Sequence, residues 1–243
     1  MVKTMKFYDL HLQTNLSSGE SSIEQIIDFA KKLGYSGIAI CDNYQGPEKL
    51  NELKNELNKI KTDLEIYPGV NIQAKDVSQL KEIISKVRER VHVVVVSGGD
   101  YQINRAACED TRVDILAHPE LGRIDSGLDE PSLNAATHNN VAIQLNFREI
   151  LYNFRKSRSY VLNHIRKNIE LCNHFRTPVI FCSGAQSVWD MRSPREFISI
   201  ANTLGMELGK AFASVTSVPQ QIIEENKKTL EGTKITEGVE VVD

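Results

Sequence analysis

The sequence predicts an α/β fold, a (β/α) barrel of the TIM type with seven or eight parallel strands. Short apolar runs of strand length alternate with longer amphipathic segments along most of the chain. The runs are continuously apolar, which is typical of parallel strands buried on both faces. Nearly every run ends in a polar residue, and in a barrel these ends meet at one face. An open doubly wound sheet is the alternative, but the even spacing of the runs favours the barrel.

Seven segments are predicted to be strands: 6–12, 37–42, 64–70, 91–97, 113–119, 141–147 and 178–184. A weaker eighth candidate, AFASVTS, covers 211–217 and leaves the strand number open. Helical periodicity is clearest in four segments, 21–34, 46–61, 76–90 and 159–175. Gly34 follows two lysines at the end of the first of these, and we predict that it caps this helix.

The chain is predicted to form one domain. Its 243 residues would suffice for one large domain or two small ones, and no internal linker interrupts the pattern. We therefore expect a single barrel over residues 1–227. Residues 228–243 are polar and lack a helical period, so we expect a flexible C-terminal tail there.

Composition is ordinary for a soluble globular protein, with 41% apolar residues and a formal net charge of −3. The longest apolar run, VHVVVV, is too short to cross a bilayer, and the N-terminus does not resemble a secretory signal. The four cysteines form no C-x-x-C pair, which argues against a zinc ribbon or a redox motif. We expect a cytoplasmic protein that has no membrane partner.

The polar strand ends are rich in amides and poor in metal ligands. His11, Asp42 and His118 are the side chains there that could bind a metal strongly. Two or three cations would need about four ligands each. Neutral amides are weak ligands for transition metals. We therefore predict no metal and no cofactor bound by the protein, and expect His11 and His118 to be hydrogen-bonded packing residues.

These strand ends resemble the PHP (polymerase and histidinol phosphatase) superfamily of metal-dependent phosphoesterases. That superfamily carries H-x-H, T-D-H, G-x-E, A-H-P and D-x-H at successive positions, and the matching stretches here are HLQ, CDN, GVN, AHP and GAQ. The resemblance implies a PHP-like barrel in which His11, Asp42 and His118 are the remnant of a metal site. The positions where ligands would stand carry Gln13, Asn43, Asn71, Gly184 and Gln186.

The chain as a whole is similar to a closer family, the protein subunit of ribonuclease P that is called component 3 in archaea. The resemblance rests on FYDLH, ILAHPE, QLNFREIL, RKSRSYVLNHIRK and VIFCSGAQSVWDMRSPREF, followed by LGME, and it covers residues from about 5 to about 225. It implies a PHP-like barrel without a metal site. Such a subunit assists a catalytic RNA that removes the 5′ leader from precursor tRNA by endonucleolytic cleavage.

The same resemblance implies the partners. They are the catalytic RNA, precursor tRNA and another protein subunit with an RNA-recognition-motif-like fold, the two proteins forming a heterotetramer. Mg²⁺ is expected in the RNA component, and the isolated chain is not expected to be catalytic. Two alternatives remain open: a PHP-type phosphoesterase with a reduced metal site, and an unrelated barrel that serves only as a protein scaffold.

Charge is segregated along the chain in a way that suits one anion-binding face. Between residues 148 and 176, seven cationic side chains stand against two acidic ones, whereas residues 224–243 carry six acids and three lysines. The RNA-binding candidates of the first stretch are Arg148, Arg155, Lys156, Arg158, Arg166, Lys167 and Arg176. The alternative interpretation is a solvated outer helix face.

A second set of candidates consists of Arg105, Arg123, Arg148 and Arg192, which are expected in loops after strands, with Arg195 close behind. In a barrel these side chains would rim the mouth, where the planar guanidinium group suits phosphate. Arg192 and Arg195 could instead only cap or pair within the short helix that starts at Pro194. The aromatic residues considered for stacking on bases are Tyr8, Tyr44, Phe147 and Trp189, although packing explains each of them as well.

Overall fold

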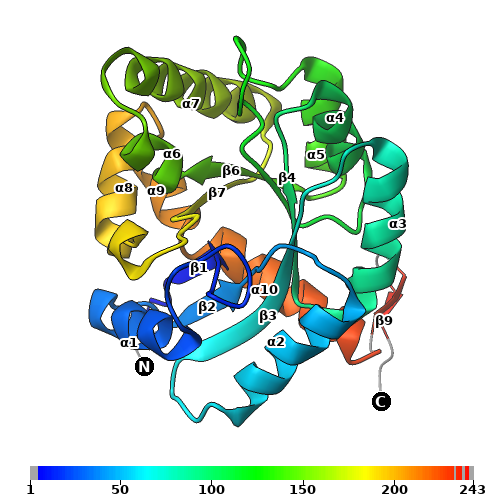
Figure 1. Cartoon of the computed structure of the whole chain (residues 1–243). Helices are drawn as coiled ribbons and strands as arrows, with labels where there is room; N and C mark the ends of the chain where they lie inside the picture. Colours follow the sequence, from blue (N-terminus) through cyan, green and yellow to red (C-terminus); the bar gives the residue numbers. More distant parts are fainter. Residues whose placement is uncertain (1–4, 233, 237–238, 241–243) are drawn as a thin grey trace.

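The structure is a computed structural model that describes residues 5–232, 234–236 and 239–240. Seven parallel strands pair in chain order and curl into a barrel (Figure 1). They are β1 (Tyr8–Leu12), β2 (Gly37–Ile40), β3 (Glu65–Ile72), β4 (Val93–Ser97), β5 (Ile115–Ala117), β6 (Ala142–Asn146) and β7 (Val179–Cys182). The predicted TIM-type barrel is confirmed, and its main sheet has seven strands.

Helices surround the strands on the outside (Figure 1). They are α1 (Ile23–Leu33), α2 (Pro47–Lys59), α3 (Val77–Val87), α4 (Tyr101–Glu109), α5 (Glu130–His138), α6 (Phe147–Tyr152), α7 (Arg155–Phe175), α8 (Pro194–Thr203), α9 (Leu208–Ala213) and α10 (Ser217–Leu230). Two short 3₁₀ turns, η1 (Arg88–Arg90) and η2 (Val188–Asp190), follow α3 and β7. Because α10 contacts β1, β4 and β7 together, it covers one end of the barrel.

Local sequence explains where these elements begin and end. The four valines of β4 are buried, as expected for a strand covered on both faces. Ser22 caps α1 in a capping box with Gln25, and Gly34 ends the helix with a φ of +85°. The predicted glycine cap is therefore confirmed. The long helix α7 starts at Arg155, four residues before the predicted start.

The predicted eighth strand at 211–217 is wrong. This segment contains the end of α9 and the turn that leads into α10. The Ser214 hydroxyl donates to the Ala211 carbonyl at 2.8 Å, and local bonds of this kind favour a helical turn over a strand. The turn nevertheless lies at the seam of the barrel, because the backbone N–H of Tyr8 in β1 donates to the Val215 carbonyl at 3.0 Å.

The other side of the seam belongs to β7. The backbone N–H of Phe181 donates to the Ser214 carbonyl at 3.1 Å. At the opposite end of the barrel the two strands meet directly, since the Gln13 N–H donates to the Ala185 carbonyl at 2.9 Å. A helical turn thus occupies the position where an eighth strand would complete the barrel.

The predicted boundary at Lys227 falls inside α10, which continues to Leu230. Beyond it, β8 (Lys234–Thr236) and β9 (Val239–Glu240) form a short antiparallel pair. Residues 233, 237–238 and 241–243 of the predicted tail lie outside the described residues. The described part of the chain contains no helix with both the length and the apolar character needed to cross a membrane.

Candidate functional site

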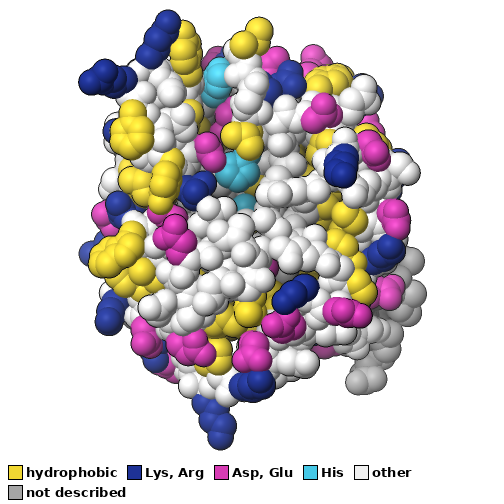
Figure 2. All heavy atoms as spheres, viewed as in Figure 1, with side chains coloured by type: hydrophobic (Ala, Val, Ile, Leu, Met, Phe, Trp, Pro, Cys, Tyr) yellow, Lys and Arg dark blue, Asp and Glu magenta, His cyan; other side chains and the backbone are white. Residues whose placement is uncertain are grey.

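The carboxyl ends of the strands surround a cavity of about 300 Å³. Figure 2 shows histidine side chains near the centre of this face, with basic and acidic side chains around them. The cavity is lined by His11, Asn71, Ser97 and His118, which lie at or just after the carboxyl ends of four different strands. The predicted convergence of polar strand ends is therefore confirmed for these four residues.

His11 is buried in the wall of this cavity, with 1% of its surface exposed. Its Nδ1 lies 2.9 Å from Oε1 of Gln144 in β6. Its Nε2 is buried and has no hydrogen-bond partner within the described part of the chain. Burial, followed by the nearby His118, lowers the pKa of His11 to about 4, so the ring is neutral at pH 7.

Two neighbouring side chains contact the His118 ring. Its backbone is left-handed, with a φ of +52°. Nε2 lies 3.1 Å from Nδ2 of Asn146, and Nδ1 lies 3.2 Å from Oε1 of Glu149. The contact with His118 is the main reason that the pKa of Glu149 lies below its usual value. The centroids of the two histidine rings are 6.1 Å apart.

Asp42 does not join the two histidines, contrary to the predicted three-residue remnant. Its carboxylate accepts hydrogen bonds from the backbone N–H of Thr14 at 2.6 Å and from the Thr14 hydroxyl at 2.7 Å. Asp42 lines a smaller, separate recess beside Tyr44. Burial raises the pKa of Asp42, although both bonds to Thr14 oppose that shift. Asp42 therefore links the end of β2 to the end of β1 through Thr14.

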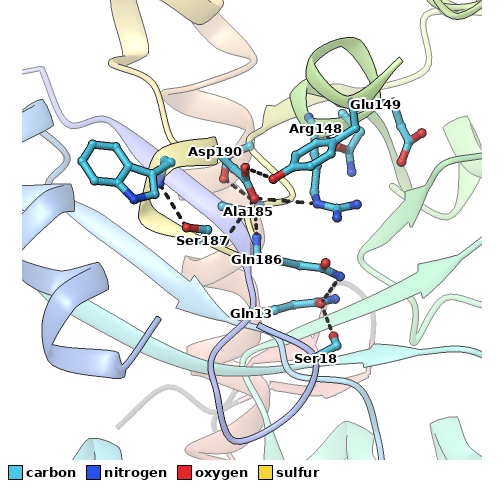
Figure 3. A network of polar contacts seen from close by, with 12 residues as sticks. Gln13, Ser18, Arg148, Glu149, Ala185, Gln186, Ser187 and Asp190 are labelled. Carbon is cyan, nitrogen blue, oxygen red and sulfur yellow. Dashed lines mark hydrogen bonds and ion pairs between the residues drawn. The ribbon is translucent and has the colours of Figure 1, made fainter. Parts of the chain in front are cut away.

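Neutral amides bind one another across the mouth of the barrel. Gln186 donates through Nε2 to Oε1 of Gln13 at 3.0 Å, and the Ser18 hydroxyl donates to the same oxygen at 2.6 Å (Figure 3). Asn71 donates through Nδ2 to Oδ1 of Asn43 at 2.8 Å. By the PHP resemblance noted above, Gln13, Asn43, Asn71 and Gln186 stand where metal ligands would be expected, and here they hydrogen-bond to one another.

A multinuclear metal centre does not fit this site. The described residues contain no group of three or more His, Cys, Asp or Glu side chains that could hold an ion. Gly184, in the position of a PHP aspartate, has a φ of +61°, and a Cβ there would lie 2.4 Å from Nδ2 of Asn146. An acidic side chain at this position would therefore displace the Asn146 side chain. The unpaired Nε2 of His11 could supply only one of the roughly four ligands that a metal ion needs.

Beside the amides, a buried carboxylate organises the rim. Asp190 accepts hydrogen bonds from the Tyr152 hydroxyl at 2.9 Å and from the backbone N–H groups of Gln186 and Ser187 at 3.0 and 3.1 Å (Figure 3). Nε of Arg148 lies 3.7 Å from the same carboxylate. We did not predict this role for Asp190. The Ser-x-x-acid spacing that ends at Asp190 is the sequence signal that could have indicated it.

The basic candidates of the first set do not form one patch. Arg148 lines the mouth, and Arg155, Lys156 and Arg158 follow at the start of α7. Further along that helix are the exposed Arg166 and Lys167, and Arg176 is its C-cap. A helix of 21 residues is about 30 Å long, so Arg176 lies at the far end from the mouth. The helical periodicity predicted over 159–175 is confirmed, and Ile165, Ile169 and Cys172 are buried on one side of α7.

The second set is also divided. Arg105 lies on α4 and pairs with Glu109 at 2.8 Å, so its predicted loop position is wrong. Arg123 lies in the loop after β5 and pairs with Asp125 at 2.6 Å. The Arg192 guanidinium group lies 5.1 Å from the centre of the Phe147 ring. Arg195 is exposed in the first turn of α8.

Sequence reasoning missed the aromatic residues that are most exposed near these cations. Tyr8 and Phe147 are buried, whereas Tyr152, Phe154 and Tyr160 are exposed and had not been selected. Each of the three has a cation four residues away: Arg148 with Tyr152, Phe154 with Arg158, and Lys156 with Tyr160. The Arg148–Tyr152 and Lys156–Tyr160 pairs have the i,i+4 spacing of a helix, which is a signal that the sequence contained, whereas Phe154 is the N-cap of α7. Trp189 is exposed, as a stacking residue would need to be.

The fold and the site together define a class, a PHP-like barrel whose mouth is lined by hydrogen-bonded neutral amides. The chain resembles the histidinol phosphate phosphatase of Lactococcus lactis with a TM-score of 0.56 over 84% of this chain and 95% of that one. The sequences are 11% identical, so this likeness concerns the fold alone. The phosphatase structure is described as a complex with zinc, L-histidinol and phosphate.

A family model described as RNase P subunit p30 matches residues 6–230, and the chain belongs to that family. It is 34% identical to the ribonuclease P protein component 3 of Methanosarcina barkeri over 98% of this chain and 96% of the relative. The component 3 of Methanothermobacter thermautotrophicus gives the same identity and the same shares. The family resemblance in the sequence is therefore confirmed.

A solved structure supports the same family. The chain matches a subunit in the cryo-EM structure of archaeal ribonuclease P with mature tRNA, with a TM-score of 0.79 and 28% identity. The match covers 97% of this chain and 98% of that subunit. The protein is thus a component of ribonuclease P, the holoenzyme that processes the 5′ leaders of tRNA. A free-standing PHP phosphoesterase is not favoured.

Proposed function

We propose that this chain binds the catalytic RNA of ribonuclease P and supports its active fold, while the RNA carries out the cleavage. The observation that carries the proposal is the amide network at the barrel mouth, which fills the positions of a hydrolytic metal centre. A component of a nuclease that lacks such a centre contributes by binding. The Lys and Arg side chains around α6 and α7 would contact the RNA phosphates.

Electrostatics explains how binding would help the RNA. Folded RNA brings phosphates close together, and Mg²⁺ normally offsets their repulsion. Lys and Arg side chains at the RNA surface take over part of that role, so the RNA reaches its active fold at lower Mg²⁺. Each phosphate contact also adds to the salt dependence of binding. The Mg²⁺ of the reaction belongs to the RNA in this proposal.

The partners follow from the same proposal. The archaeal structure is described as ribonuclease P with mature tRNA, which supports RNA and protein partners in general. We extend this to precursor tRNA as the substrate and to a second protein subunit with an RNA-recognition-motif-like fold. The two proteins form a heterotetramer, and the assembly works in the cytoplasm.

Reconstitution tests the proposal. Catalytic RNA and the partner subunit are assayed on precursor tRNA at limiting Mg²⁺, with and without this chain. We expect faster cleavage, or cleavage at lower Mg²⁺, when the chain is present. An Arg155→Gln/Lys156→Gln variant should retain less of this effect than a Lys49→Gln/Lys59→Gln control on α2. An unchanged rate and Mg²⁺ requirement with the wild-type chain would contradict the proposal.

Salt dependence separates RNA binding from a purely scaffolding role. RNA affinity measured over a series of salt concentrations should fall steeply with salt if several phosphates are neutralised. A flat dependence, or the absence of binding, would favour a protein scaffold that contacts only other subunits.

A further inference from the structure

Three large aromatic side chains stand exposed around the junction of α6 and α7. Tyr152, Phe154 and Tyr160 have 51%, 68% and 53% of their surface exposed. Aromatic rings dominate cores and interfaces, and a cluster of exposed ones marks a binding surface. Figure 2 shows hydrophobic and basic side chains interleaved on this side of the molecule, over α6 and α7. We call these three rings and their cations, Arg148, Lys156 and Arg158, the aromatic–cation corner.

The rings and cations of the corner are paired in order. The guanidinium carbon of Arg148 lies 4.4 Å from the centre of the Tyr152 ring, and that of Arg158 lies 5.4 Å from the centre of the Phe154 ring. Nζ of Lys156 lies 5.7 Å from the centre of the Tyr160 ring. Each ring therefore has a positive charge against it, and more than half of each side chain is open to solvent.

Part of the corner is fixed by hydrogen bonds. The Tyr152 hydroxyl is anchored on the buried Asp190 carboxylate at 2.9 Å. Nε of Arg158 donates to the Asn153 carbonyl at 2.6 Å, and Nδ2 of Asn153 donates to the Glu149 carbonyl at 2.8 Å. These bonds hold one ring and one cation in place before any partner arrives, which lowers the entropy cost of binding.

The charge of the corner selects an anionic partner. From Arg148 to Tyr160 the chain carries four cations and one acid, and that acid, Glu149, is drawn towards His118 at 3.2 Å. The corner also contains the start of α7, which no side chain of the described residues caps. The positive end of the α7 dipole therefore adds to the positive potential of the corner.

On this basis, we infer that the aromatic–cation corner is a stacking site for unpaired nucleotides of the RNA. Single-stranded RNA offers open base faces and a phosphate chain together, and proteins bind it with aromatic platforms beside cations. In a duplex the base faces are already stacked on each other, so the rings would gain little. The inference rests on the proposed RNA-binding function and specifies which form of RNA this surface takes.

Binding of a labelled oligouridylate of about twenty nucleotides, followed by fluorescence anisotropy, tests the inference. In the full chain, Tyr152→Leu/Phe154→Leu/Tyr160→Leu should weaken binding at least about tenfold, because each stacked base contributes substantially to affinity. The salt dependence should stay unchanged, since the cations remain. Tyr101→Leu on α4 is the matched control, because Tyr101 is also an exposed tyrosine and is 39% exposed. That variant should bind like the wild type.

Two further variants separate rings from charges and from folding defects. Tyr152→Phe/Tyr160→Phe keeps the rings and should retain most of the affinity for the oligonucleotide. Lys156→Gln/Arg158→Gln should weaken binding and also reduce the salt dependence by about two phosphate contacts. Equal losses in all three variants, with a lowered melting temperature, would show a folding effect and contradict the inference.

The remaining outcomes decide between RNA and protein at this surface. If the leucine variant binds the oligonucleotide like the wild type but no longer co-purifies with the partner subunit, the corner is a protein interface and the inference is wrong. The inference is also wrong if the triple leucine substitution weakens binding to a duplex RNA of the same length as much as it weakens binding to the single strand. Neither result touches the proposed function, which fails only if the wild-type chain has no effect in the reconstituted cleavage assay.

Discussion

Three ionisable side chains, Asp9, His11 and Glu120, are almost fully buried. Burial raises the pKa of Asp9 to about 6 and the pKa of Glu120 to about 7, and it lowers the pKa of His11 to about 4. All three shifts favour the neutral form. As the pH rises from about 4.5 to 7, the unfolded chain ionises its glutamate before the folded chain does, so Glu120 makes the fold progressively less stable. His11 destabilises the fold as the pH falls from about 6.5 to 4.

We predict that Glu120→Gln stabilises the protein at pH 8 by on the order of 2 kcal/mol, because the amide has no ionised form to desolvate. The amide oxygen can keep the long contact with Nδ2 of Asn168, which is 3.5 Å in the native protein. At pH 4 the difference should nearly vanish. Urea unfolding at both pH values measures it. Glu89→Gln, at an exposed position, is the control, and an equal gain at the two pH values would contradict the explanation.

At the scale of elements, α10 and η1 are joined at the closed end of the barrel by one buried acid. Nη1 of Arg88 lies 2.8 Å from Oδ2 of Asp114, and Nδ2 of Asn226 donates to Oδ1 at 2.8 Å. The backbone N–H of Val94 in β4 donates to the same carboxylate at 2.6 Å. One carboxylate thus ties a strand, a 3₁₀ turn and the last long helix together.

Removal of the cation should be costly. Arg88→Met leaves the Asp114 carboxylate buried without its charge partner, and we expect a loss of about 3–5 kcal/mol in the free energy of unfolding. Arg88→Met/Asp114→Asn should recover part of this loss, because the uncompensated charge is gone. Denaturant unfolding measures both variants. Arg90→Met in the same turn serves as the control, and a similar loss there would rule out the buried pair as the cause.

Elements were easier to predict than their contacts. Continuous apolar runs identified the seven strands of the main sheet, because burial on both faces leaves a local signature. The eighth candidate at 211–217 has similar local composition, but its place at the seam is filled by a turn. Nothing local shows that Asp42 turns to Thr14, or that Gly184 leaves no space beside Asn146. Both contacts join residues from different strand ends, and their distances are set only when the barrel closes.

For the whole molecule, the amide network links the strand ends at the barrel mouth through side-chain hydrogen bonds. Metal sites usually couple ion binding to stability, because the ligands must be drawn together around the charge. Here Gln13, Asn43, Asn71 and Gln186 are drawn together by their own hydrogen bonds. The strand ends at the mouth are therefore linked by side-chain hydrogen bonds within the chain itself.

We predict that the purified protein carries well under one tightly bound zinc, manganese or iron per chain, and that a chelator leaves its melting temperature unchanged. Elemental analysis and thermal melting with and without the chelator measure both. About one metal per chain that is lost in a His11→Ala variant would contradict this prediction and revive a reduced catalytic centre.

The seam between β1 and β7 has a consequence during synthesis. Tyr8 leaves the ribosome well before its seam partner Val215, which follows it by 207 residues in the chain. Until Val215 emerges, the barrel remains an open sheet with two unpaired edges. Open edges of this kind pair readily with other chains. Every newly made copy therefore passes through a stage in which association with other copies competes with closure.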